Sequence, residues 1–407
     1  MGYKNTVIKG IGWLGAIRLS TRALTIVKTI VIARILSPDQ FGLFGIATLM
    51  LALIEILTET GINIFLVQQK EKVDQYISTA WIISIVRGIC ISIVLLSCSS
   101  LVAGFFNAPH ALPLLYISSL IPLLRGFINP SVITFQKELF FKKEFIYRTT
   151  VFLVETISSM ILVILFPSPT SLIYAIAIGV VYEIGFSFMV AKPRPIFSFD
   201  LKLFRKILSQ GKWITLSTIL NYIYQHGDDI AVGRLLGTAS LGYYDMAYRI
   251  SLIPITDIGD VIAKVTFPIY VKISHDKKRL QEAFIKSFLL VVGIVVPIGI
   301  VLFIFPKEIV TLVLGEKWLP IVDVLRVLGV FGVVRSLSLF ATTFFLSVQK
   351  QRVFSLVTFV GMAALCIIIV PFVNAWGIVG AGYAALIGTL ATIPVVFYFL
   401  KREFGKT

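Results

Sequence analysis

The chain has 407 residues, of which 57% are hydrophobic and only 14% are charged. Soluble globular proteins carry about 25% charged residues, so this composition, with a mean hydropathy of +0.94, excludes a soluble protein and indicates an integral membrane protein. The net charge of +16 would suggest nucleic-acid binding in a soluble protein. In a membrane protein, however, an excess of Lys and Arg in the cytoplasmic loops can account for a positive net charge, so the distribution of these residues among the loops must be examined first.

The apolar runs are about 20 residues long, the length that a helix needs to cross roughly 30 Å of hydrocarbon. They are too long for the strands of a membrane barrel, which take about 10 residues. We therefore predict an all-α membrane protein with about 12 transmembrane helices. The expected spans are residues 8–33, 42–66, 77–101, 112–134, 147–166, 171–191, 212–233, 243–268, 284–305, 319–346, 353–373 and 378–400.

One stretch of the sequence occurs twice. Residues 34–44 close one apolar run and open the next, and residues 234–244 do the same at an offset of 200 residues. A second pair, Thr-Glu-Thr-Gly at 58–61 and Thr-Asp-Ile-Gly at 256–259, keeps nearly the same offset, 198 residues. Two matches at nearly the same offset indicate a duplication. Each half then has six spans, an even number, so both halves insert with the same orientation.

We therefore predict two parallel six-helix repeats related by a pseudo-two-fold axis along the membrane normal, with a substrate path between them. The N-terminal lobe is expected at residues 1–195 and the C-terminal lobe at 212–407. The connection between them, residues 196–211, is basic and amphipathic, so we expect it to lie on the cytoplasmic membrane surface.

Loops that are rich in lysine and arginine alternate along the chain with loops that contain few of these residues. If the N-terminus is cytoplasmic, the inside connections hold 24 of these residues, and the outside connections hold only Arg34, Arg234, Lys307 and Lys317. Cytoplasmic loops are enriched in Lys and Arg, so we predict a multi-pass protein of the cytoplasmic membrane with both termini inside. Most of the positive charge then reflects topology, and no nucleic-acid partner is expected.

Three motifs resemble a known family. They are the Ala-Arg-x-Leu-Ser-Pro-x-x-Phe-Gly run at residues 33–42, the Thr-Glu-Thr-Gly of the second span, and the Asp-x-x-x-Gly-Arg-x-Leu-Gly-x-x-x-Leu-Gly-Tyr run at 229–243. They look like those of polysaccharide-export flippases of the lipopolysaccharide and teichuronic-acid type, within the multidrug/oligosaccharidyl-lipid/polysaccharide exporter superfamily. The motifs are specific for the family but do not indicate which sugars the transported polysaccharide unit contains.

The resemblance implies a two-lobed carrier that works by alternating access. Its substrate would be an undecaprenyl-diphosphate-linked oligosaccharide repeat unit, moved across the cytoplasmic membrane for surface polysaccharide assembly. The expected partners are that lipid-linked oligosaccharide and membrane lipid; coupling to H⁺ or Na⁺ and contact with glycan polymerase machinery are left open. Many family members have about fourteen helices, whereas the hydropathy pattern here predicts about twelve.

Four arginines inside the expected spans are candidate substrate ligands. A charge in the middle of a bilayer is costly, so such residues normally face a watery cavity or a partner. Guanidinium groups bind phosphate oxygens with two parallel hydrogen bonds, which suits a diphosphate. The set is Arg18, Arg22, Arg125 and Arg335. The alternative is that these arginines pair with Glu55, Glu59, Glu155 or Glu183.

A set of carboxylates inside the spans could couple transport to an ion gradient by binding a proton or Na⁺. The alternative is that they neutralise the arginines or hold helices together. The set is Glu55, Glu59, Asp228, Asp229 and Asp257.

The sequence contains no enzyme signature, such as a phosphate-binding loop, a zinc-binding histidine pair or a nucleophile elbow. The three cysteines lack metal-ligand spacing, so neither a metal nor a cofactor is expected, and we predict a carrier rather than an enzyme. A cation-coupled multidrug exporter of the same superfamily would favour an acidic cavity, whereas the deep charges here include a basic set. A membrane glycan polymerase or ligase would be expected to carry a large outer loop, and the outer connections here are short.

Overall fold

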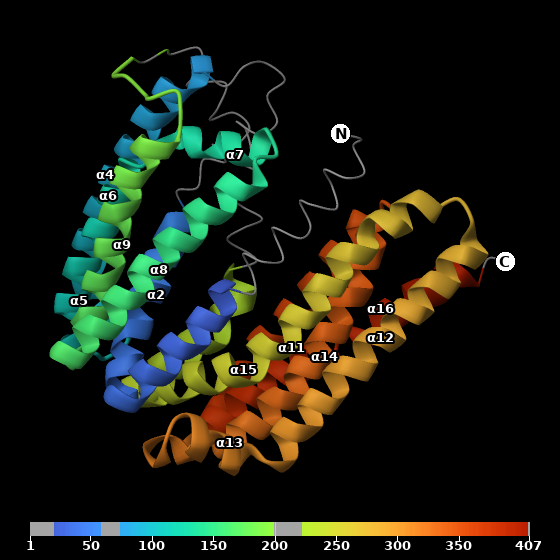
Figure 1. The fold of residues 1–407 in the computed structure, drawn as a ribbon. Coiled ribbons are helices and arrows are strands. Elements are labelled where there is room, and N and C mark those ends of the chain that lie inside the picture. Colours follow the sequence, from blue (N-terminus) through green and yellow to red (C-terminus); the bar gives the residue numbers. More distant parts are fainter. Residues whose placement is uncertain (1–19, 58–73, 199, 201–221, 406–407) are drawn as a thin grey trace. The chain divides into compact units, whose positions relative to one another are not determined.

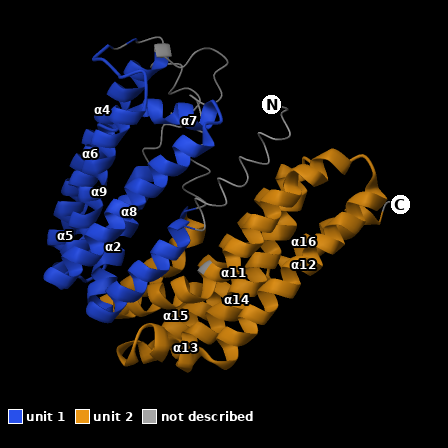
Figure 2. Ribbon diagram, viewed as in Figure 1, with its two compact units in different colours: residues 1–222 blue, residues 223–407 orange. Residues whose placement is uncertain are grey.

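Helices make up all the regular secondary structure in the described part of the computed structural model, which covers residues 20–57, 74–198, 200 and 222–405 (Figure 1). The chain divides into two compact units, residues 1–222 and 223–407 (Figure 2). Most of the predicted linker, residues 196–211, lies outside the described residues.

The predicted all-α membrane fold is confirmed. Seven helical stretches among the described residues are long and apolar enough to cross a membrane. Large apolar side chains such as Ile161 and Ile300 are each 51% exposed, which hydrocarbon tolerates and water does not. The protein is therefore a multi-pass membrane protein. The number twelve stays a prediction, because several expected spans are only partly described. The seven stretches are Pro38–Ile56, Tyr76–Phe105, Phe141–Leu165, Pro169–Val190, Lys277–Ile304, Glu316–Ser347 and Gln351–Phe404.

Unit 1 is a helical bundle in which α4 packs along α6, and α8 packs along α9. Its first described helix covers residues 20–35. The remaining elements are α2 (Pro38–Leu57), α4 (Asp74–Phe105), η1 (Pro109–Ala111), α5 (Leu112–Ser118), α6 (Leu120–Gly126), η2 (Pro130–Ile133), α7 (Thr134–Lys137), α8 (Phe141–Leu165) and α9 (Pro169–Val190).

The fourth expected span, residues 112–134, is not one straight helix. The chain bends by 71° between the stretch Pro109–Gly126 and the stretch Pro130–Lys137. Pro130 cannot continue the helix because it has no N–H, and the Asn129 side chain accepts a hydrogen bond from the backbone N–H of Ser131 to start η2 instead. As a result Arg125, expected midway along a span, lies in the last turn of α6 beside the bend.

Unit 2 is built around α14 (Val322–Ser347), which packs against α11 (Thr238–Ile273), α12 (Lys277–Ile304) and α15 (Gln351–Leu390). Its core includes the buried aromatic residues Tyr270, Phe284, Phe340, Phe344 and Phe345. The other elements are a helix over residues 222–236, α13 (Pro306–Val313), η3 (Glu316–Ile321) and α16 (Ile393–Phe404). Gly377, with a φ of +58°, turns the chain sharply within α15, so this element contributes to both of the last two expected spans.

The repeated motif forms a tight helix-to-helix turn in each unit. In the first copy the Ser37 hydroxyl accepts the Gln40 N–H at 3.3 Å, and the Gln40 side chain accepts the Ser37 N–H at 2.9 Å. This reciprocal capping box, with Pro38 at the first helical position, starts α2. In the second copy Gly237 adopts a φ of +85° and α11 starts at the next residue. Both copies thus end one expected span and begin the next.

Candidate functional site

Unit 1 contains an open cavity of about 650 Å³. The residues that line it come from helix 20–35, α2, α4, α6, the segment from the bend to α7, α8 and α9. Charged side chains within membrane-spanning helices are rare and mark functional paths, yet this cavity gathers several. They are Glu55, Arg87, Arg125, Glu144, Arg148, Glu155 and Glu183.

Two arginines reach the cavity from the crossing of α4 and α6. Gly88 and Gly126 allow the two backbones to touch there, because a Cβ atom at either residue would meet backbone atoms of the other helix. Arg87 and Arg125 are the residues that precede these glycines and both line the cavity. The glycine contact therefore fixes the position of this arginine pair.

Arg125 is both a cavity residue and an ion-pair partner. Its Nη1 donates to Glu55 Oε1 at 2.7 Å and to Oε2 at 2.9 Å. Cavity lining and pairing with a glutamate were alternatives in the sequence analysis, and the structure combines them. Nη2 and Nε make no hydrogen bond within the described residues, so one edge of the guanidinium remains able to donate to a ligand.

A polar stripe runs along α8. Glu144, Arg148 and Glu155 are spaced by four and seven residues, so they lie on one helix face. Arg148 Nε donates to Glu144 Oε1 at 2.9 Å, and Lys28 of helix 20–35 donates to Glu155 Oε1 at 2.7 Å. The second oxygen of Glu144, Oε2, is buried and has no hydrogen-bond partner in the described part of the chain.

Aromatic rings fix the same wall of the cavity. Tyr147 of α8 stacks on Phe186 of α9, with ring centroids 5.7 Å apart, and meets Phe135 edge to face at 6.2 Å. Its hydroxyl donates to Glu183 Oε1 at 2.9 Å. The phenol therefore holds a cavity carboxylate in place without neutralising its charge.

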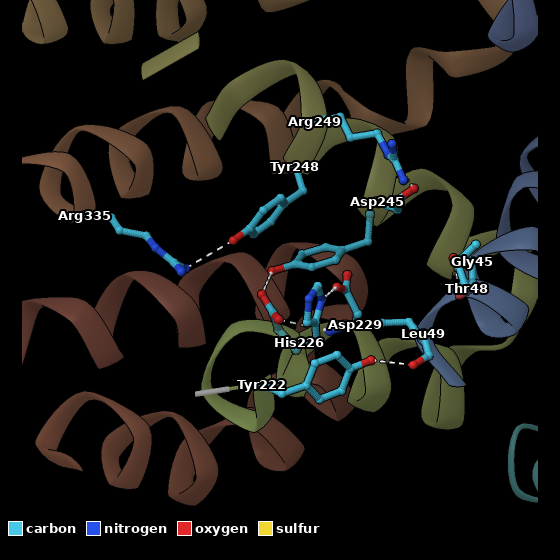
Figure 3. A network of polar contacts seen from close by, with 12 residues as sticks. Gly45, Thr48, Leu49, Tyr222, His226, Asp229, Asp245, Tyr248, Arg249 and Arg335 are labelled. Atoms are coloured by element: carbon cyan, nitrogen blue, oxygen red, sulfur yellow. Dashed lines mark hydrogen bonds and ion pairs between the residues drawn. The ribbon is translucent and has the colours of Figure 1, made fainter. Parts of the chain in front are cut away.

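Unit 2 carries a separate polar network on the helix 222–236, α11 and α14 (Figure 3). The Tyr244 hydroxyl donates to Asp228 Oδ2 at 2.8 Å, and the Asp229 backbone N–H donates to Asp228 Oδ1 at 3.1 Å. His226 Nδ1 lies 3.1 Å from Asp229 Oδ2. Asp228 and Tyr244 are buried, so the network places carboxylates in an apolar interior with their donors supplied by tyrosine, histidine and backbone.

Arg335 approaches this network from α14. It donates to the Tyr248 hydroxyl at 3.1 Å (Figure 3). It also lies over the rings of Tyr224 and Phe331 at 5.8 and 5.5 Å. Within the residues that the structure describes, Arg335 forms no ion pair with a carboxylate. A cation held by aromatic faces keeps its charge available for an anionic ligand.

The other predicted site residues are placed as follows. Arg22 lies on helix 20–35 and is half-buried, and Asp257 lies half-buried on α11. Arg18 and Glu59 fall outside the described residues. The structure thus pairs Arg125 with Glu55 in unit 1. In unit 2 it places Asp228, Asp229 and Arg335 in one polar network.

Sequence reasoning missed the tyrosines and the polar stripe of α8. Tyr147, Tyr244 and Tyr248 each hold a charged site residue, yet a tyrosine in an apolar run resembles any buried aromatic residue. Glu144 and Arg148 could have been found, because an acid four residues before a base forms a pair on a helix face. They were missed because Glu144 falls outside the expected span 147–166, and Arg148, at the edge of that span, was counted among the 24 inside basic residues.

The family model described as "Polysaccharide biosynthesis protein" matches residues 31–323. The chain belongs to this polysaccharide biosynthesis family. The matched range includes the turn motifs at 33–42 and 229–243, so the resemblance drawn from those residues is confirmed. The lipopolysaccharide biosynthesis protein WzxC of Escherichia coli (strain K12) is 29% identical over 339 residues, which cover 83% of this chain and 69% of the relative.

Two solved structures show that the fold of this polysaccharide biosynthesis family member is shared more widely. Lipid II flippase MurJ in an inward closed conformation aligns with a TM-score of 0.78 at 16% identity, covering 96% of this chain and 89% of that chain. A multidrug resistance MATE family transporter of the MOP superfamily, facing inward, aligns with a TM-score of 0.72 at 15% identity over 95% of this chain and 96% of that chain. The chain therefore shares its fold with both of these proteins, and the sequence family is what points to polysaccharide biosynthesis.

Proposed function

We propose that this protein is a flippase that moves undecaprenyl-diphosphate-linked oligosaccharide units across the cytoplasmic membrane by alternating access, for surface polysaccharide assembly. The observation that carries the proposal is the combination of a polysaccharide biosynthesis family sequence with a membrane-helix fold whose unit 1 holds a charged cavity. A polar headgroup on a lipid needs a polar path through hydrocarbon, and lining charged residues supply it.

In this proposal the protein is a carrier and makes or breaks no covalent bond. Both termini and the 196–211 linker lie in the cytoplasm, supported by the 24 to 4 distribution of Lys and Arg. The substrate then enters from the inside and leaves on the outside. The lobes at residues 1–195 and 212–407 would rock about a path between them, as parallel repeats in transporters do.

The diphosphate is bound by arginines of the set Arg18, Arg22, Arg125 and Arg335. Arg125 supports this role because Glu55 occupies only its Nη1. Arg335 supports it because its described neighbours are aromatic rings and a hydroxyl rather than carboxylates. Both guanidinium groups therefore retain donors for phosphate oxygens.

Energy for the cycle comes from H⁺ or Na⁺ binding to carboxylates of the set Glu55, Glu59, Asp228, Asp229 and Asp257. The supporting observation is the burial of Asp228 with Tyr244 as its side-chain donor. A buried carboxylate that gains or loses a cation changes the interactions that hold its helices together.

The test uses surface polysaccharide produced by cells that lack their own copy of the gene and carry variants of it. Arg125→Ala should lower export about tenfold or more, because hydrogen bonds to charged groups contribute ~1.5–3 kcal/mol. Arg125→Lys keeps the charge but not the fork, so its effect should be intermediate. The control is Arg326→Ala, since Arg326 pairs with Asp323 at an exposed position and should leave export unchanged.

The double variant Arg125→Ala with Glu55→Gln separates substrate binding from charge neutralisation. If Arg125 binds the diphosphate, removing the charge of Glu55 does not restore export. Full recovery in the double variant would show that Arg125 only neutralises Glu55, and the proposed substrate contact would have to be withdrawn.

A further inference from the structure

We propose that the α8 and α9 wall of the unit 1 cavity binds the sugar part of the lipid-linked substrate, with Glu144 as the central acceptor of sugar hydroxyl groups. This inference rests on the proposed function. It assigns to this wall a role different from that of Arg125, which belongs to the diphosphate. The ligand class is a neutral polyhydroxyl group attached to a diphosphate.

The unsatisfied oxygen of Glu144 is the first reason. The residue is only 6% exposed, and it lines the cavity. Arg148 occupies Oε1, whereas Oε2 is buried with no hydrogen-bond partner among the described residues. Buried polar atoms are normally satisfied, and a carboxylate oxygen can only accept. A ligand that enters the cavity with an O–H donor would complete this group.

The charge of the wall is the second reason. Glu144, Glu155 and Glu183 line the cavity from this side, and their cationic partners are Arg148 and Lys28. The wall therefore has one more negative than positive side chain. It repels a diphosphate, while its carboxylate oxygens attract hydroxyl donors.

Rigidity is the third reason. Tyr147 is held between Phe135 and Phe186 and fixes Glu183 through its hydroxyl at 2.9 Å. Glu144 is held by Arg148 one turn along the same helix. Acceptors fixed before the ligand arrives lose little entropy on binding, so this wall can discriminate among headgroups. The cavity of about 650 Å³ also falls in the range of small-molecule sites, roughly 300–1,000 Å³.

The arrangement divides the cavity by chemistry. Arg87 and Arg125 reach it from α4 and α6, with the lining carboxylate Glu55 of α2 beside Arg125. Glu144, Glu155 and Glu183 reach it from α8 and α9, with the lining cation Arg148 beside Glu144. The first side therefore has a net positive charge and the second a net negative charge. A headgroup with a diphosphate at one end and a sugar at the other matches this division, because each end meets its own complementary groups.

The experiment measures binding to the full-length protein in lipid nanodiscs. The probes are undecaprenyl diphosphate alone and undecaprenyl diphosphate carrying glucose, galactose or N-acetylglucosamine. We expect at least one glycosylated probe to bind wild type about tenfold more tightly than the bare lipid, which is the effect of one hydrogen bond to a charged group. This ratio is the sugar increment.

Glu144→Gln should abolish the sugar increment while binding the bare lipid at least as tightly as wild type, because it removes a negative charge that repels the diphosphate. Arg148 donates to one side-chain oxygen, so the glutamine carbonyl will face Arg148 and its NH₂ will replace Oε2. A donor then stands where the sugar needs an acceptor. The matched control is Glu138→Gln, because Glu138 is an exposed carboxylate that does not line the cavity, and it should keep the full increment.

Two outcomes would overturn the inference while leaving the proposed function intact. The first is that wild type binds the bare lipid and no sugar strengthens that binding. The second is that Glu144→Gln retains the increment. Retained affinity for the bare lipid shows that the variant is folded. Failure of wild type to bind the bare diphosphate lipid would instead count against the proposed function itself.

Discussion

Substituting alanine for Gly88 or Gly126 should force α4 and α6 apart. A Cβ atom at Gly126 would lie 2.9 Å from the carbonyl oxygen of Ser84 and 2.9 Å from the Cα atom of Ile85. A Cβ atom at Gly88 would overlap the carbonyl oxygen of Pro122. These neighbours are backbone atoms, so no side-chain rotation can make room, and the helices themselves must move.

The expected cost follows from this contact. Overpacking a tight interface costs ~1–3 kcal/mol, and a gap of ~0.5–1 Å forfeits a quarter to a half of the dispersion energy of the facing atoms. Because backbone must shift, we expect a cost near the upper end, about 3 kcal/mol. Alanine regains up to about 1 kcal/mol through its better helix propensity, so the net loss of stability should be about 2 kcal/mol.

Thermal unfolding of the purified protein in detergent measures this loss, with Gly185→Ala as the matched control. Gly185 lies within α9, and a Cβ atom there would have no atom within 4 Å apart from the adjacent backbone of its own helix, so this variant should be as stable as wild type or slightly more stable. Gly88→Ala and Gly126→Ala should also lower export, because the adjacent Arg87 and Arg125 would be displaced. If Gly126→Ala unfolds at the same temperature as Gly185→Ala, the close backbone contact is refuted.

Tyr244→Phe should lower the free energy of unfolding by about 1.5–3 kcal/mol, which is the contribution of a hydrogen bond to a charged group. The hydroxyl of Tyr244 donates to Asp228 Oδ2 at 2.8 Å, and Asp228 is only 3% exposed, so water cannot replace the lost donor. The unfolding temperature checks this against Tyr243→Phe, whose hydroxyl makes no hydrogen bond within the described residues, and equal stability of the two variants would contradict it. Topology is tested with cysteines placed at Lys278 and Lys317 and a membrane-impermeant maleimide. Position 317 should react from outside intact cells, and reaction at position 278 would reverse the predicted orientation.

The sequence determined the class and the family. Runs of about 20 apolar residues leave helices as the main solution in a bilayer, since every backbone polar group must be satisfied within the segment. The positions of most described helices followed from the length and hydropathy of the apolar runs. Both properties belong to contiguous stretches of the chain, so they can be read without knowledge of the fold.

The tertiary structure alone decided which charges meet. Arg125 and Glu55 are 70 residues apart in sequence, and their contact depends on the rotation of α6 and α2 about their axes, which hydropathy does not encode. Glu144 lies in the loop expected between residues 134 and 147, yet it belongs to α8 and the packing of this helix buries one of its oxygens. The bend at Pro130 likewise shifted Arg125 to a helix end. Each result depends on contacts between helices, which form only when side chains of particular shapes pack together.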